Sequence, residues 1–168
     1  LIPLIALGVA ALLHILPWFD PRLRRTSGDE SLMPAVLPIV RIATLGLLDV
    51  VLFVQIATSL GRNIAGGRII ITSILVFFLV LGNYLGNVRP NYFVGIRTPW
   101  TLENPDTWRA THRLGGRLMF FGALILLMAQ FFLSEAIFAL LFIGSILSLA
   151  AWAFIYSWHH CRTHDEAR

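Results

Sequence analysis

The sequence predicts an all-α polytopic transmembrane helical bundle that forms a single integral membrane domain over residues 1–168. Hydrophobic residues make up 57% of the chain, charged residues make up 13%, and the mean hydropathy is +0.77. A soluble domain carries about twice this share of charged residues, so the composition argues against that class. The apolar residues are also gathered into long runs, which leave little of the chain for a separate soluble domain.

Five apolar runs predict five spans. A helix needs about 17–25 apolar residues to cross the hydrocarbon core, and four of the runs reach this length. The fourth run in chain order is slightly short unless residues 114–116 add a turn to it. The first run is a poor signal peptide, because it lacks a basic start and a small-residue cleavage site. The runs are Leu1–Phe19, Leu37–Leu60, Ile69–Leu85, Leu118–Leu133 and Ala136–Trp158.

The arginines predict the orientation of the bundle. Two of them, Arg62 and Arg68, lie in the segments on one side of the predicted bundle. The segments on the other side contain Arg22, Arg24, Arg25, Arg89, Arg97, Arg109, Arg113, Arg117, Arg162 and Arg168. An excess of Lys and Arg marks the cytoplasmic side, so the connection over residues 87–117 and the C-terminus are expected to be cytoplasmic.

The 87–117 loop is rich in Arg, Pro and Trp. Its prolines predict extended backbone from Arg89 to Trp100, and Gly95 permits a sharp turn. Asn104 and the proline after it are typical of a helix start, so a short interfacial helix is expected up to about Leu114. Trp108, Thr111, His112 and Gly115 share one face of this helix, and Arg109, Arg113 and Arg117 form a basic stripe. The pair Gly115-Gly116 then allows either a bend into the fourth span or close helix packing.

The amino-acid sequence of this loop resembles that of the SdpI family of small bacterial integral membrane proteins. After Asn87, the chain reads Arg-Pro-Asn-Tyr-Phe-x-Gly-Ile-Arg-Thr-Pro-Trp-Thr-Leu over residues 89–102 and Trp-x-x-Thr-His-Arg-x-Gly-Gly over residues 108–116. The resemblance implies a multi-pass protein of the bacterial cytoplasmic membrane, with one further span before Leu1. It also implies immunity to a membrane-active peptide toxin, and a possible relay of the toxin signal by recruitment of a cytoplasmic repressor protein. No direct contact with nucleic acid is expected.

Two interpretations of the loop remain open. It can be an interfacial cap whose arginines bind lipid phosphates, or a docking surface for a cytoplasmic protein or an anionic headgroup. His112 is the one loop residue with acid–base potential near neutral pH, but no nucleophile accompanies it, so an enzyme is not expected. The candidate docking residues are Asn87, Arg89, Pro90, Asn91, Tyr92, Gly95, Arg97, Thr98, Pro99, Trp100, Trp108, Thr111, His112 and Arg113.

Polar residues within the predicted spans form a second candidate set, His14, Asp49 and Gln55. Asp49 falls near the midplane, where a carboxylate costs at least ~2.5 kcal/mol, so it is expected to face the bundle, to be paired or to be protonated. A small transporter or an accessory subunit of a membrane complex is therefore the alternative function. No cofactor motif is present. The sequence His159-His160-Cys161-x-x-His164 superficially resembles a metal cluster, but it is expected to be a solvated helix end and not a metal site.

Overall fold

The computed structural model describes residues 33–91 and 94–165, together with short helical stretches within the first 15 residues. The described part of the chain is all-α and contains no strand. Four of its helices are long and apolar enough to cross a membrane, which confirms a polytopic helical bundle. Most of the first predicted span lies outside the described residues, as do His14 and Tyr92. The helices are α3 (Met33–Ser59), α4 (Gly66–Leu85), α5 (Pro99–Glu103), α6 (Pro105–Ala129) and α7 (Glu135–Asp165).

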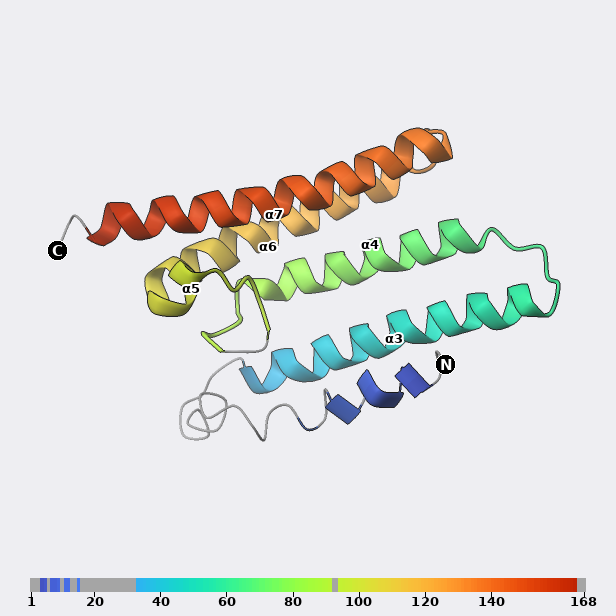
Figure 1. The fold of residues 1–168 in the computed structure, drawn as a ribbon, viewed down its shortest axis with the longest axis horizontal. Coiled ribbons are helices and arrows are strands. Elements are labelled where there is room, and N and C mark those ends of the chain that lie inside the picture. Colours follow the sequence, from blue (N-terminus) through green and yellow to red (C-terminus); the bar gives the residue numbers. More distant parts are fainter. Residues whose placement is uncertain are drawn as a thin grey trace.

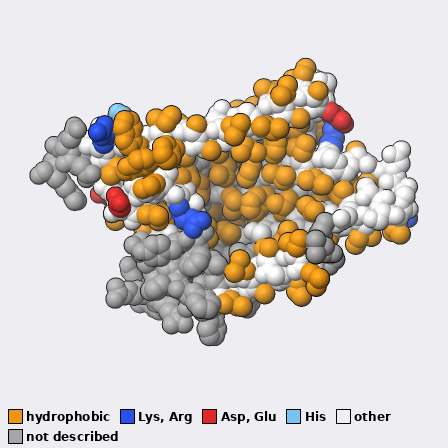
Figure 2. Space-filling model, in the orientation of Figure 1, with side chains coloured by type: hydrophobic (Ala, Val, Ile, Leu, Met, Phe, Trp, Pro, Cys, Tyr) orange, Lys and Arg blue, Asp and Glu red, His pale blue; other side chains and the backbone are white. Residues whose placement is uncertain are grey.

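The four long helices lie side by side (Figure 1). Helix α4 packs against α3 on one side and α6 on the other, and α7 packs against α6. The short helix α5 lies at one end of the bundle, against α6 and α7. We call this the loop end, and we call the end with Arg62 and Ser134 the opposite end. Figure 2 shows hydrophobic side chains over the middle of the bundle and charged side chains gathered at its two ends, as expected for a protein that crosses a membrane.

Helix α6 differs from the expectation for its region. A separate interfacial helix up to Leu114 and a span over 118–133 were expected, but one continuous helix runs from Pro105 to Ala129. The second half of the 87–117 loop is therefore the first half of α6. The helix is not interrupted at Gly115-Gly116, and both glycines pack closely against neighbouring elements.

Close packing of α4 and α6 depends on Gly82 and Gly116. A Cβ atom at Gly116 would lie 2.7 Å from the carbonyl oxygen of Gly82, and a Cβ at Gly82 would lie 2.8 Å from the carbonyl oxygen of Gly116. Small residues at such a crossing let two helix backbones approach, and this is a common device in membranes, where lipid is as apolar as a leucine side chain. This backbone contact fixes where α6 lies and thus positions the loop end.

Two further helix bounds correct the sequence-based expectation. The backbone from Arg89 to Trp100 was expected to be extended, but α5 already begins at Pro99, because a proline suits the first helical position and Thr98 caps the helix. Helix α7 continues past the predicted span end at Trp158 to Asp165, and Cys161 on it is buried. The segment is thus a helix end, as expected, with His159, Arg162 and Thr163 exposed, and the correction concerns Cys161, which is buried.

Candidate functional site

Trp108 anchors the 87–98 segment to the start of α6. Its side chain is fully buried, and its indole Nε1–H donates to the Val88 carbonyl at 2.7 Å. Val36 of α3 and Leu85 of α4 belong to the same buried cluster. An indole buries a large apolar area only if its N–H finds an acceptor, and the Val88 carbonyl meets that need. The residue thus joins three helices and the segment at one point.

His112 lies one turn further along α6 and stacks on Trp108, with ring centroids 4.0 Å apart. Its Nε2 accepts from the Ile96 N–H at 2.9 Å, and its Nδ1 lies 2.8 Å from the Trp108 carbonyl. An N–H donor at Nε2 requires that the ring proton sit on Nδ1, which then donates to Trp108. Both nitrogens are therefore occupied in a fully buried ring. His112 pins the 87–98 segment to α6, and the structure gives no support for the acid–base role considered from sequence.

Gly95 makes the hydrogen bond between Ile96 and His112 possible. Its φ is +124°, a backbone conformation that only glycine adopts readily. A Cβ atom at this position would collide with Nε2 of His112 and lie 3.3 Å from the Trp108 ring. The turn expected at Gly95 is thus present, and it brings the backbone into direct contact with the His112 ring.

Asn91 organises the preceding turn. Its side chain is 1% exposed, and Oδ1 accepts from the Val94 N–H at 2.6 Å. Its Nδ2 donates to the carbonyls of Arg89, at 2.8 Å, and Val94, at 3.0 Å. A short amide side chain that replaces missing backbone hydrogen bonds is typical of a tight turn. Asn91 therefore holds the loop in shape from within.

Threonines connect α5 to α7. Thr98 caps α5, and its Oγ1 donates to Ser157 Oγ at 2.8 Å. Thr101 Oγ1 accepts from the Thr98 N–H and donates to the Ile96 carbonyl, both at 2.9 Å. Trp100 meets Phe154 of α7 edge to face, with ring centroids 4.9 Å apart. The loop end is thus bonded to the last third of a helix that begins at the opposite end.

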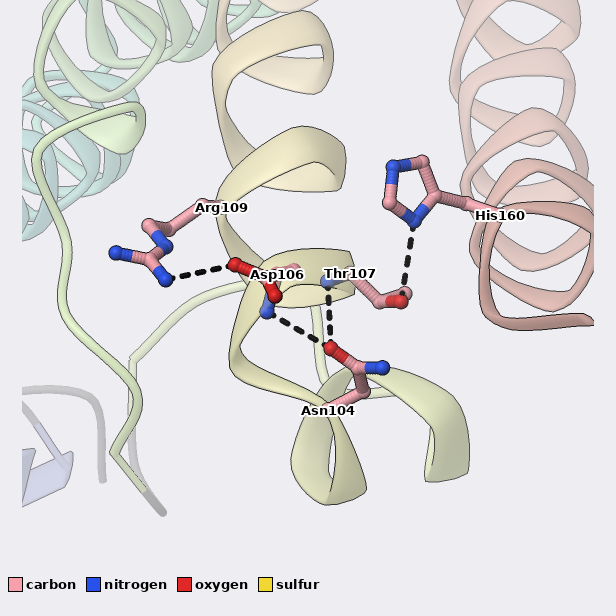
Figure 3. A network of polar contacts seen from close by, with 5 residues as sticks. All are labelled: Asn104, Asp106, Thr107, Arg109 and His160. Atoms are coloured by element: carbon pink, nitrogen blue, oxygen red, sulfur yellow. Dashed lines mark hydrogen bonds and ion pairs between the residues drawn. The ribbon is translucent and has the colours of Figure 1, made fainter. Parts of the chain in front are cut away.

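The start of α6 is held by a polar network (Figure 3). Asn104 Oδ1 accepts from the N–H groups of Asp106, at 2.8 Å, and Thr107, at 3.2 Å, so it is the N-cap that the sequence predicted. Asp106 also forms an ion pair with Arg109 at 2.7 Å. Thr107 Oγ1 lies 3.2 Å from Nδ1 of His160, which ties the start of α6 to the end of α7.

Burial divides the described candidate docking residues into three sets. Pro90 and Trp100 are half-buried. The buried set, which can only shape the loop end, is Asn91, Thr98, Trp108, Thr111 and His112. The exposed set, which can contact a partner, is Asn87, Arg89, Gly95, Arg97, Pro99 and Arg113. The cap interpretation fits the first set, and a docking interpretation is restricted to the second.

Sequence reasoning missed the contribution of α7 to this site. Ser157 is fully buried and bonds Thr98, which is 59 residues earlier in the chain. The one available signal was a hydroxyl side chain within the aromatic run from Phe154 to Trp158. His160 belongs to the same group, because it contacts Thr107.

The intramembrane polar residues are not gathered into one site. Asp49 is exposed on α3, so of the three alternatives expected for it, the one in which it faces the bundle does not hold among the described residues. Gln55 is exposed as well. The buried polar contact lies at the opposite end, where Thr72 Oγ1 donates to Gln130 Oε1 at 3.0 Å and Arg68 donates to the Gln130 carbonyl at 2.9 Å. Gln130, at the end of α6, thus bonds to α4.

Comparison with known proteins finds that the loop end is similar to one protein family. Residues 87–157 match the SdpI/YfhL protein family, and this stretch contains the whole network described above except the contacts of α3, α4 and His160. The chain is also 23% identical, over 163 residues, to the immunity protein SdpI of Bacillus subtilis (strain 168). That alignment covers 95% of this chain and 75% of the relative. No solved structure matches the chain.

Proposed function

We propose that this chain belongs to the SdpI/YfhL protein family, which it matches over residues 87–157. We further propose that it protects its cell from a membrane-active peptide toxin and relays the presence of that toxin to a cytoplasmic regulator. The observation that carries this proposal is the match over residues 87–157, together with a relative that is named an immunity protein. The matched stretch also includes a loop that is held to α6 and α7 by hydrogen bonds with His112, Ser157 and Trp108. The proposed role is binding and not catalysis.

The loop end is the proposed surface for the regulator. Arg89 and Arg97 are exposed there, and hydrogen bonds with Asn91 and His112 hold the backbone at Arg89, Val94 and Ile96. A fixed backbone lowers the entropy lost when a partner binds, so exposed side chains on such a segment suit recognition. Guanidinium groups bind carboxylates with two parallel hydrogen bonds, and an acidic patch on the regulator is therefore the expected counterpart.

The arginine distribution supports a cytoplasmic loop end. Among the described residues, Arg62 and Arg68 lie at the opposite end. The loop end and its neighbouring turns have Arg89, Arg97, Arg109, Arg113, Arg117 and Arg162. In the proposed arrangement the apolar outer faces of the helices meet the toxin within the bilayer, and the loop end faces the regulator.

Co-culture tests immunity. A strain that lacks the gene for this chain should lose viability and membrane potential when it grows beside its parent, and the intact gene should restore both. Equal survival of the deletion strain and its parent would contradict the immunity proposal. The assay uses the natural producer, so it does not require that the toxin be identified first.

A second arm tests the relay. Arg97→Ala should leave the protein abundant in the membrane and the survival of the strain intact, because the side chain lies outside the spans. It should reduce the transcriptional response to the parent strain at least severalfold. Arg62→Ala, at the opposite end, is the matched control and should not change that response. An Arg97→Ala strain with a normal response would remove this surface from the relay.

A further inference from the structure

A recess with a volume of about 290 Å³ opens between α4 and α6, next to the loop end on the side towards the middle of the bundle. It exists because three glycines bring the two helices together without side chains to fill the space between them. The recess, which we call the glycine recess, is lined by Gly82, Asn83, Gly86, Gly116, Arg113, Arg117, Phe120 and Phe121.

The polar side chains of the glycine recess have no partners among the described residues. Arg113 and Arg117 are both exposed and form no hydrogen bond or ion pair there, and the same is true of the Asn83 amide. Arg109, one turn earlier on the same stripe, is instead paired with Asp106. Like charges four residues apart on a helix repel each other, so the Arg113–Arg117 pair would be stabilised by an anion between the two side chains.

The apolar side of the recess continues along the membrane-spanning part of α6. Phe121 is 58% exposed and Ile125 is 67% exposed, and both follow Arg117 at helical spacing. The stripe therefore changes from cationic to apolar as it runs from the loop end towards the middle of the bundle. A ligand that matches it must have an anionic group beside a long hydrocarbon chain.

We propose that the glycine recess binds an anionic phospholipid from the leaflet at the loop end. Arg113 and Arg117 bind the phosphate through charge-assisted hydrogen bonds, and the Asn83 amide donates a further one. The acyl chain lies along Phe121 and Ile125, where it replaces no protein contact. This site is separate from the proposed regulator surface, which uses Arg89 and Arg97 on the 87–98 segment.

Lipid retention in the purified full-length chain tests the site. The protein is exchanged into nanodiscs of phosphatidylcholine that contain a small fraction of phosphatidylglycerol, and the retained lipid is measured by native mass spectrometry. Each basic residue near an anionic headgroup contributes roughly a fivefold preference. Arg113→Gln combined with Arg117→Gln should therefore reduce retention of phosphatidylglycerol by about 25-fold.

Matched variants distinguish specific lipid binding in the glycine recess from nonspecific attraction to the surface charge of the protein. Arg109→Gln removes one positive charge from the same stripe, as each single Arg113→Gln or Arg117→Gln change does. It should change retention less than twofold, against about fivefold for either of those single variants, because Asp106 already pairs with Arg109. The double variant Arg113→Lys/Arg117→Lys keeps the charge but loses the bidentate geometry, and it should retain several times less lipid than the native chain.

Three outcomes would overturn the proposal. Equal retention of phosphatidylglycerol and phosphatidylcholine would show that the recess does not select charge. Full retention of phosphatidylglycerol by the lysine variant would mean that the lipid is held only by nonspecific attraction to positive charge. Displacement of phosphatidylglycerol by inorganic phosphate at comparable concentration would identify a soluble anion as the ligand. Because Arg113 and Arg117 are exposed, a circular dichroism spectrum should confirm that each variant is folded.

Discussion

The backbone N–H of Ile96 donates to Nε2 of His112 across 16 residues of sequence, and this bond joins the 87–98 segment to α6. The ring that accepts it is fully buried and stacks on Trp108. The bond therefore lies where water cannot replace it. Removal of either partner leaves a buried polar group without a hydrogen bond.

His112→Ala is expected to destabilise the protein by about 3–5 kcal/mol, because it leaves a cavity beside Trp108 and the Ile96 N–H without an acceptor. The midpoint of denaturation in detergent measures this loss. His159→Ala is the matched control, since His159 is exposed on α7, and it should change stability by less than about 0.5 kcal/mol. Similar midpoints for the two variants would mean that His112 does not pin the segment.

Gly95→Ala should loosen the 87–98 segment. The substitution places a Cβ against His112 and also requires a positive φ of a non-glycine residue, which alone costs about 1–3 kcal/mol. Gly61→Ala is a control for the strain, because its φ is +72° and no atom lies within 4 Å of the added Cβ. Limited proteolysis at Arg97 should be accelerated in the Gly95 variant but not in the Gly61 variant. Equal cleavage rates would contradict the contact with His112.

Gly116→Ala should separate α4 from α6. The new Cβ would approach the backbone oxygen of Gly82, which cannot move aside as a side chain can. Gly122→Ala, on the same helix, adds a methyl group where no atom lies within 4 Å. Only the first variant should lower the thermal midpoint, and it should also abolish selective retention of phosphatidylglycerol. A normal midpoint for Gly116→Ala would mean that the helices are less close than described.

Thiol labelling of intact cells should place the loop end in the cytoplasm. In a Cys161→Ala background, Ser134→Cys should react with an impermeant reagent from outside, whereas Glu103→Cys should react only after permeabilisation. Glu103 and Ser134 are both exposed and thus suitable positions. Thr101 is unsuitable because it is buried in the cap of α5. External labelling of Glu103→Cys would reverse the orientation and remove the proposed cytoplasmic surface.

Asp49→Asn should be tolerated with little change in abundance or in protection during co-culture. The side chain is exposed on α3, and the substitution keeps its shape while it removes a charge that is unfavourable in a membrane. Asp49→Leu should likewise preserve the bundle, because no described core contact depends on the carboxylate. Loss of protection by an abundant Asp49→Asn protein would instead indicate that protonation at this position is part of the mechanism.

Local patterns predicted part of this structure well. Asn104 was identified as an N-cap and Trp108, Thr111 and His112 as one helix face, because both features depend only on residues within one or two turns. The role of Gly116 could not be decided in the same way. A glycine permits a bend and permits close packing equally, and the choice depends on Gly82, which lies on another helix.

Other features required knowledge of how the helices are rotated. Helix α3 is apolar on most of its surface, so no stripe in its sequence shows which way Asp49 points. The Thr98–Ser157 bond joins positions 59 residues apart, and nothing in the sequence around either position identifies the other as its partner. Such contacts follow from the packing of whole helices, which sequence periodicity does not determine.

The Thr98–Ser157 bond also links the tilt of α7 to the position of α5. This helix has 31 residues, and at 1.5 Å per residue it is about 46 Å long. A tilt of about 3° around one end moves the other end by about 2 Å, which is more than a hydrogen bond tolerates. Ser157 therefore cannot shift that far unless α5 moves with it or the bond breaks. The position of α5 at the loop end is therefore coupled, through one hydrogen bond, to the tilt of a helix that begins at the opposite end.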